Sequence, residues 1–228
     1  MTEVITVRGS TNSYLLKLKD GYLLIDISMP HDFRRFLRKI KKLKIDISEI
    51  KYLLLTHSHA DHTGYAEQFL QASNAKLIAH ENTLPHLFNG TMESDSKPVN
   101  FYYKIMFILA VVALKHGFQP ITIAEKRIIT IKGDDDKLFK KLGIDGKIIT
   151  TFGHTNDSIT VVLNDGRGFV GDTCSNRSTF YFGKGKRPAF IIEEELLMQS
   201  WRKIIDHGVK TIYPAHGKIF PIEDLRLE

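Results

Sequence analysis

The sequence predicts an α/β protein with a single domain, and three observations support this. Short β-rich runs alternate with helical patterns along the 228 residues. That length lies within the range of one sizeable core. No internal repeat, low-complexity tract or Pro/Ser-rich linker interrupts the sequence. We therefore expect one domain over residues 1–228, with an apolar helical insertion around residues 84–120.

The expected strands are short and are bounded by turn signals. Lys19-Asp20-Gly21 and Asn164-Asp165-Gly166 are typical of hairpin turns. Tyr52–Leu55 is a continuous apolar run, which favours a strand buried on both faces. The predicted strands are Val4–Val7, Tyr14–Leu18, Tyr22–Ile27, Tyr52–Leu55, Lys76–Ala79, Arg127–Ile131, Lys147–Phe152, Ser158–Leu163, Gly168–Gly171 and Thr211–Tyr213.

Helical spacing of apolar residues predicts a helix over Phe33–Ile45, with Pro30 near its first turn. Further helices are expected after Gly64 to about Ala72, over Ile192–His207, and from about Pro221. The first helix carries seven basic residues and no acid, so its charge alone is larger than the net charge of the whole chain, which is +6. A solvated basic face is the simpler interpretation of this helix, and a surface for anionic partners is the alternative. We expect no nucleic-acid partner.

A second unusual segment, Phe101–Leu114, is almost wholly apolar. As a helix it would be roughly 21 Å long, which is too short for the roughly 30 Å core of a bilayer. We therefore expect no membrane span. A helix buried on most sides, a homodimer contact, or a lid over an apolar pocket all remain possible for this segment.

One cysteine excludes a disulfide framework and fits a reducing compartment. The N-terminal residues lack the basic start and the long apolar run of a signal peptide. The expected location is therefore the cytoplasm.

The chemistry is concentrated in Thr56–Gly64, which contains His57, His59, Asp61 and His62. Such a cluster is too polar for a core and too concentrated for an ordinary surface loop. In extended backbone His57 and His59 project to the same side, while Asp61 and His62 lie at the turn into a helix. Imidazole nitrogens and carboxylate oxygens are the ligands that zinc and similar metals take.

Three more residues of these types follow predicted strands, each beside a glycine. They are His154 in Gly153-His154-Thr155, Asp172 in Gly171-Asp172-Thr173, and His216 in Ala215-His216-Gly217. Loops at strand ends are where α/β scaffolds place ligands. We therefore predict a metal site assembled from distant parts of the chain.

The order H-x-H-x-D-H, a single His, an Asp, and a final His before Gly resembles the pattern of the metallo-β-lactamase superfamily. The resemblance extends from Asp26, in the position of an N-terminal Asp of that family, to His216, and so covers nearly the whole chain. It implies a four-layer αββα sandwich of two mixed β-sheets. It also implies two divalent ions, zinc first, with iron or manganese as alternatives. His57, His59 and His154 would bind one ion, Asp61, His62 and His216 the other, and Asp172 both. Asp26 looks structural and stands outside this set.

The same resemblance implies a hydrolase in which a hydroxide bridging the metals attacks the substrate, with Asp61 orienting it as a catalytic residue. The family's branches differ beyond the metal site. Only 12 residues follow His216, whereas the glyoxalase II branch carries a helical C-terminal domain there. Ser175 stands where the lactonase branch has Tyr. Asp172 stands where the common β-lactamases have Cys, which disfavours antibiotic hydrolysis as the native role. We expect a small-molecule ester, thioester or lactone as substrate. An iron-dependent redox or sulfur-oxidising protein, a phosphodiesterase or nuclease, and a nucleic-acid-binding module are the alternatives.

Several other polar residues are interpreted without a role in the site. Cys174 is expected to be a small buried hydrophobe, with a ligand or redox-sensitive thiol as the alternative. Tyr181 and Lys184 fit an ordinary surface loop, with substrate contact as the alternative. The remaining histidines, which we take to be ordinary exposed or satisfied residues, are His31, His80, His86, His116 and His207.

Overall fold

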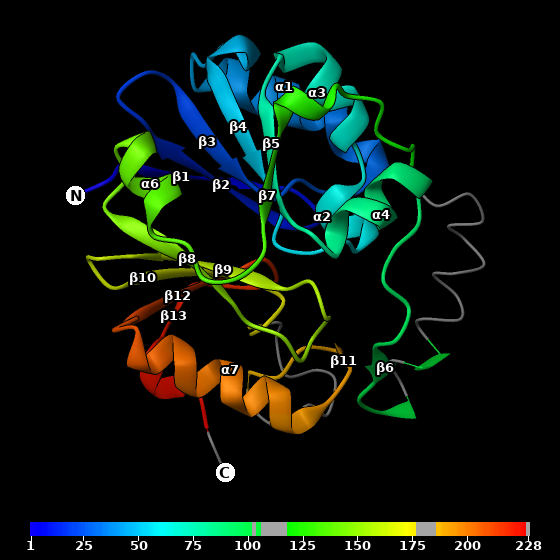
Figure 1. Ribbon diagram of the computed structural model, residues 1–228, viewed down its shortest axis with the longest axis vertical. Helices are drawn as coiled ribbons and strands as arrows, with labels where there is room; N and C mark the ends of the chain where they lie inside the picture. Colours follow the sequence, from blue (N-terminus) through cyan, green and yellow to red (C-terminus); the bar gives the residue numbers. More distant parts are fainter. Residues whose placement is uncertain (102–103, 106–117, 177–185, 227–228) are drawn as a thin grey trace.

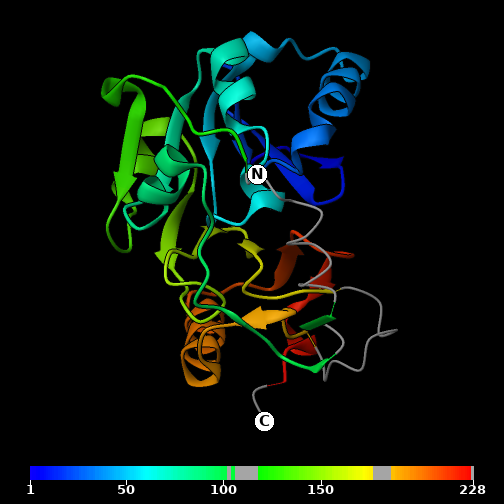
Figure 2. The ribbon, with the colours of Figure 1, turned by 90° about the vertical axis from the view of Figure 1, so that its right-hand side faces the viewer.

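Two mixed β-sheets lie face to face, and helices cover the outer side of each (Figure 1). The coordinates are a computed structural model, and the structure describes residues 1–101, 104–105, 118–176 and 186–226. Figure 2, turned by 90°, shows the N-terminal half of the chain on one sheet and the C-terminal half on the other.

The first sheet has the strand order β1-β2-β3-β4-β5-β7. Its first three strands are antiparallel, and β3, β4, β5 and β7 run parallel to one another. The strands are β1 (Val4–Arg8), β2 (Asn12–Lys17), β3 (Tyr22–Ile25), β4 (Ile50–Leu54), β5 (Lys76–His80) and β7 (Ile128–Ile131).

The second sheet has the order β13-β12-β10-β9-β8. Within it β10 and β12 are parallel, while β9 runs antiparallel to both β8 and β10. Its strands are β8 (Gly146–Thr150), β9 (Ile159–Leu163), β10 (Arg167–Gly171), β12 (Thr211–Pro214) and β13 (Phe220–Pro221). A separate two-stranded ribbon pairs β6 (Lys97–Pro98) with β11 (Phe190–Ile191).

The helices lie between these strands in the chain. They are α1 (Phe33–Lys42), α2 (Ala60–Thr63), α3 (Ala66–Ser73), α4 (Thr83–Asn89), α6 (Lys137–Leu142) and α7 (Glu194–Asp206). Single turns of 3-10 helix are η1 (Pro30–Asp32), η2 (Ile47–Glu49), η3 (Glu125–Arg127) and η4 (Ile222–Asp224). Among the described residues, no helix is long and apolar enough to cross a bilayer.

Side chains that alternate along the strands create the layers, because successive residues of a strand face opposite sides. On β4, Leu53 packs with Phe36 of α1 and Phe69 of α3, whereas Leu54 faces the other sheet. The layer between the sheets includes Leu54 and Phe169. On the far side of the second sheet, α7 inserts its apolar face against Val162 and Val170, with Leu197, Trp201 and Ile204 as the main contacts. The predicted αββα sandwich is confirmed.

Most predicted elements are present with shifted ends. The strand from Tyr22 ends at Ile25 because Asp26 takes a left-handed backbone conformation, with φ 54°. The basic helix ends at Lys42, since Lys44 also has positive φ, at 58°. The helical pattern after Gly64 was predicted without α2, which already begins at Ala60. The expected closing helix is wrong in type: strand β13 and a single 3-10 turn occupy that position.

Two further helices had no predicted bounds. α4 overlaps the start of the helical insertion expected around residues 84–120, and α6, between β7 and β8, was not predicted. Most of the segment Phe101–Leu114 lies outside the described residues, as do Tyr181 and Lys184. The insertion, the lid and the homodimer contact therefore stay predictions.

Candidate metal centre

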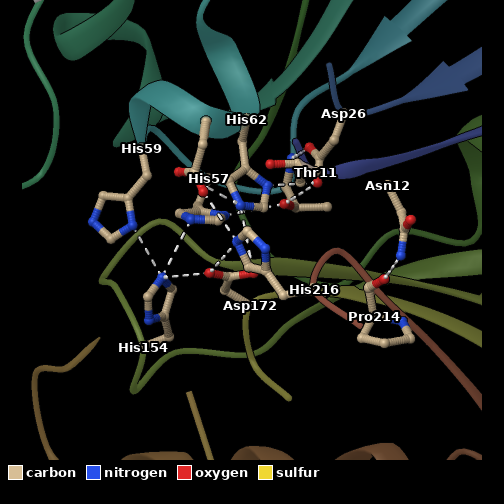
Figure 3. A network of polar contacts seen from close by, with 12 residues as sticks. Thr11, Asn12, Asp26, His57, His59, His62, His154, Asp172, Pro214 and His216 are labelled. Carbon is tan, nitrogen blue, oxygen red and sulfur yellow. Dashed lines mark hydrogen bonds and ion pairs between the residues drawn. The ribbon is translucent and has the colours of Figure 1, made fainter. Parts of the chain in front are cut away.

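The predicted site residues follow strands whose carboxyl ends meet at one edge of the sandwich. β4 leads into His57, β8 into the loop of His154, β10 into Asp172 and β12 into the loop of His216. Because β8, β10 and β12 run in the same direction, their ends lie together. Figure 3 shows the histidines from these segments and Asp172 pointing toward one another.

The first cluster, which we call the three-histidine group, consists of His57, His59 and His154. The Nε2 atom of His154 lies 3.2 Å from Nε2 of His57 and 3.1 Å from Nδ1 of His59. The candidate ligand atoms of these residues lie within 4.8 Å of one another. Three ring nitrogens therefore face a common point.

Hydrogen bonds on the outer side of two of these rings fix which nitrogen faces that point as a lone pair. His154 Nδ1 donates to the carbonyl oxygen of Phe190 at 2.6 Å, since a carbonyl can only accept. Thr56 Oγ1 donates to Asp26, so it accepts from His57 Nδ1 at 3.1 Å. The Nε2 atoms of His57 and His154 then present lone pairs to each other. Such lone pairs repel unless a cation lies between them, which is the arrangement of a metal site.

The second cluster, which we call the acid-rich group, consists of Asp61, His62 and His216. His216 Nε2 lies 3.0 Å from Asp61 Oδ2, and His62 Nε2 lies 3.9 Å from Asp61 Oδ1. His62 Nε2 is buried and has no hydrogen-bond partner among the residues that the structure describes. A buried nitrogen of this kind needs a ligand or a proton to compensate its lost hydration.

Asp172 lies between the two groups. Its Oδ2 is 3.4 Å from His216 Nε2 and 3.9 Å from His154 Nε2, and its Oδ1 is 3.4 Å from His62 Nε2. The Oδ1 atom is also buried without a hydrogen-bond partner in the described part of the chain. One carboxylate thus reaches a histidine from each group. The unpartnered atoms and the set of imidazole and carboxylate donors fit divalent metal ions.

The electrostatic environment differs between the groups. Burial, together with the neighbouring histidines, lowers the pKa of His57 well below its ordinary value. Burial and nearby His59 lower the pKa of His154 to about 4. For His216, burial alone would lower the pKa, but the carboxylates of Asp172 and Asp61 raise it to about 9. Burial likewise opposes the charge on His62, yet Asp172, Asp26 and Asp61 raise its pKa well above the usual range.

The carboxyls of the site are held in the charged form. Burial would raise the pKa of Asp172, but His216 and His62 lower it well below its ordinary value. The same balance of burial against His62 and His216 lowers the pKa of Asp61. Two anionic carboxylates beside histidines with raised pKa values form a field that favours bound cations.

The site opens to solvent on the side of Asp61. Its side chain is 32% exposed, compared with 14% for His59 and 13% for Asp172. The other histidines of the site are 8% exposed or less. A substrate can therefore approach from the side of Asp61 and His59.

Asp26 has a more specific position than the sequence suggested. Its Oδ1 accepts from the Thr56 backbone N–H at 2.8 Å, and its Oδ2 accepts from Thr56 Oγ1 at 2.7 Å and from His62 Nδ1 at 2.9 Å. Asp26 is 2% exposed. A carboxylate in this position fixes the ring of His62 and directs its Nε2 into the site (Figure 3). The interpretation of Asp26 as structural was incomplete, because it orients a site residue directly.

The loop of His216 is held from the other end of the chain. Asn12 donates from its backbone N–H to Ala215 at 2.8 Å and from its side chain to Pro214 at 3.1 Å (Figure 3). The hydroxyl of Tyr14 also donates to the Pro214 carbonyl, at 2.7 Å. The first sheet thereby positions a histidine that the second sheet carries.

With this geometry established, comparison with known proteins identifies the family. The sequence pattern described as the metallo-beta-lactamase superfamily matches residues 6–216, which is most of the chain and includes all seven predicted site residues. The chain belongs to the metallo-beta-lactamase superfamily.

Curated members of the superfamily share about a quarter of their residues with this chain. A metallo-beta-lactamase fold-containing protein of Sulfurisphaera tokodaii is 25% identical over 75% of this chain and 62% of its own length. An atrochrysone carboxyl ACP thioesterase of Aspergillus aculeatus is 23% identical over 97% of this chain and 55% of its own length. The chain spans less than two thirds of the length of these relatives. A protein named as a probable metallo-hydrolase of Methanocaldococcus jannaschii is 25% identical over 92% of this chain and 89% of its own length.

Solved structures of the superfamily agree in fold. An archaeal metallo-beta-lactamase superfamily protein from Sulfolobus tokodaii superimposes with a TM-score of 0.64 and 20% identity, over 94% of this chain and 77% of that one. This likeness confirms the fold of two mixed sheets with outer helices.

Other residues of this superfamily member have clear positions. Cys174 is fully buried and packs with the α7 layer, as expected of a small hydrophobe. His80 is buried; its Nδ1 accepts from the Asn82 backbone N–H at 3.2 Å, whereas its Nε2 has no hydrogen-bond partner within the described residues. Sequence reasoning missed Phe190 and Glu93, which contact His154 and His59. Phe190 acts through its backbone and leaves no side-chain signal, and Glu93 lies in a run of polar residues without a recognisable pattern.

Proposed function

We propose that this chain is a metal-dependent hydrolase of a small ester, thioester or lactone that uses two divalent ions, with zinc as the favoured metal. The observation that carries the proposal is the convergence of five histidines and two aspartates from both sheets onto one solvent-facing point. Membership of the superfamily and the likeness to a metallo-hydrolase support it.

The ligand set follows from the two groups. His57, His59 and His154 would hold one ion, Asp61, His62 and His216 the other, and Asp172 would reach both. When bound, such a pair of ions supplies a water of lowered pKa and an electrophilic centre for the scissile carbonyl.

The chain's own residues then orient the reaction. Asp61 is the most exposed of the seven side chains and stays anionic, so it can accept a hydrogen bond from the attacking water. Asp26 keeps the Nε2 of His62 directed into the site, and the Phe190 carbonyl does the same for His154. The buried histidines exclude bulk water from the inner side of the site, so that the substrate reacts on the side of Asp61.

Thioesters come first among the substrates because one relative is named as an ACP thioesterase. The decisive experiment combines metal analysis with a panel of a thioester, a lactone, a carboxylic ester and a phosphodiester. We expect about two zinc-like ions per chain and turnover of a carbonyl substrate. Asp61→Asn should reduce kcat by about 10²–10⁴-fold, because the neutral amide is a poorer hydrogen-bond acceptor for the attacking water and a poorer metal ligand.

The control is His31→Gln, which changes an exposed histidine outside the seven site residues and should leave turnover unchanged. Turnover of the phosphodiester alone would contradict the proposed ester, thioester or lactone substrate and indicate a phosphodiesterase. About one iron per chain with oxygen consumption would replace hydrolysis by redox chemistry.

A further inference from the structure

The β6–β11 ribbon and the segment before β6 lie against the three-histidine group, and each contacts one of its members. Phe190 of β11 accepts the Nδ1 proton of His154. The pairing of Phe190 with Pro98 and of Ile191 with Lys97 brings the segment before β6 to the same place. That segment contains Glu93. Figures 1 and 2 show the two short strands side by side, apart from both large sheets.

Glu93 is a buried carboxylate with a defined set of partners. It is 3% exposed, and its Oε2 lies 3.8 Å from His59 Nε2. Its oxygens accept from the backbone N–H groups of Asp95 and Ser96, the latter at 3.3 Å. Its own N–H donates to Ser58 Oγ at 3.2 Å, which ties the segment to the residue before His59.

The two nitrogens of His59 therefore face different partners. Nδ1 faces Nε2 of His154 inside the group, at 3.1 Å, and Nε2 faces the carboxylate. At 3.8 Å this contact is electrostatic and not a hydrogen bond. The negative charge of the carboxylate favours a proton on the facing Nε2 and so leaves Nδ1 as the lone pair. The outer partners of His57, His59 and His154 then all select the nitrogen that faces the common point.

We propose that Glu93 is a positioning residue that holds the proton of His59 on Nε2, presents Nδ1 as the ligand, and sets the metal affinity of the three-histidine group. Phe190 of the ribbon and Glu93 of the segment before β6 thus each act on one ligand of the three-histidine group. This inference rests on the proposed function, because it assumes that the group binds metal.

The test is a titration of metal-free protein with zinc in competition with a chromophoric chelator. In Glu93→Gln we expect one of the two binding steps to weaken by about 10–100-fold, as loss of a carboxylate partner of a ligating histidine does. The other step should stay within about threefold. His154→Ala removes a ligand of the three-histidine group, so the binding step that this variant loses is the step that belongs to that group.

Glu67→Gln is the matched control. Glu67 is also a buried carboxylate, 6% exposed, and accepts from the Thr122 backbone N–H at 2.8 Å and from Gln71 at 3.0 Å. Both zinc steps should be unchanged in this variant. Equal weakening of both steps in Glu93→Gln, or no weakening, overturns the proposal.

A measurement on the wild-type chain keeps the proposal testable if Glu93→Gln does not fold. Nitrogen-15 spectra of the zinc-loaded protein should show the His59 proton on Nε2, and a proton on Nδ1 overturns the proposal. A wild-type chain that binds no zinc at all contradicts the proposed function, whereas normal zinc binding with an unchanged Glu93→Gln contradicts only the role of Glu93.

Discussion

The two ligand groups lie side by side, yet they are built differently. The three-histidine group contains no carboxylate, and burial keeps His57 and His154 neutral. In the acid-rich group, the carboxylates of Asp172 and Asp61 raise the pKa of both histidines, and Asp26 adds to this at His62, so that these histidines hold protons strongly. In the metal-free protein, protons thus occupy the acid-rich group and not its neighbour. We therefore expect metal binding to displace protons from the histidines of the acid-rich group but not from His57 and His154 of the three-histidine group.

The strongest test of this comparison is Asp172→Asn, because Asp172 reaches both groups. The amide has nearly the same shape but no charge, and its NH₂ would face His62 or His216. We expect loss of both ions and a fall in kcat/KM on the order of 10³-fold, more than the roughly 10–100-fold that loss of an outer partner costs. Elemental analysis and kinetics measure these effects. Retention of two ions in Asp172→Asn would mean that this carboxylate is not shared.

A smaller effect is expected from Asp26→Asn, the counterpart of Glu93→Gln on the other group. Asp26 accepts the Nδ1 proton of His62 directly, so the variant should weaken the acid-rich step by about 10–100-fold. The three-histidine step should weaken less, because Asp26 reaches His57 only through the hydroxyl of Thr56. Chelator competition separates the steps. Thr56 also loses a charged acceptor, so we expect unfolding free energy to fall by about 1–3 kcal/mol. Equal weakening of the two steps would remove the distinction between the groups.

The smallest effect concerns the stability of the metal-free protein as pH changes. The folded-state pKa of His216 is raised to about 9, so its contribution is fully present below its unfolded value, about 6.5, and is lost as pH rises through about 9. The folded-state pKa of His154 is lowered to about 4, so its contribution is present above about 6.5 and is lost as pH falls toward about 4. Thermal unfolding across this range, with histidine NMR titration, measures both. Similar pKa values for the two histidines would contradict the comparison.

The sequence was sufficient to predict the architecture and all seven converging residues. The cluster His57 to His62 is dense, and His154, Asp172 and His216 each follow a predicted strand beside a glycine. The resemblance to the superfamily then placed all seven residues in one site before any coordinates. Strand ends were predicted less well because they depend on single backbone conformations, such as the positive φ of Asp26.

The residues that orient the ligands could not be predicted for a different reason. Phe190 contributes a carbonyl oxygen, which every residue possesses. Glu93 is brought to His59 by its hydrogen bond to Ser58 and by the pairing of β6 with a strand some 90 residues later. Such contacts depend on tertiary packing and leave no local pattern. α6 was missed because it is one and a half turns long and is formed by a short stretch rich in lysine.

The hydrogen bonds between Asn12 and the loop of His216 also bear on how the molecule folds. The partners Asn12 and Pro214 are 202 residues apart, and His57 and His154 are 97 residues apart. A chain that has been synthesised only to residue 150 contains four of the seven ligand residues and nothing to close the site. High contact order of this kind slows folding, so metal capture should be a late event that locks a sandwich already formed rather than a nucleus that starts it.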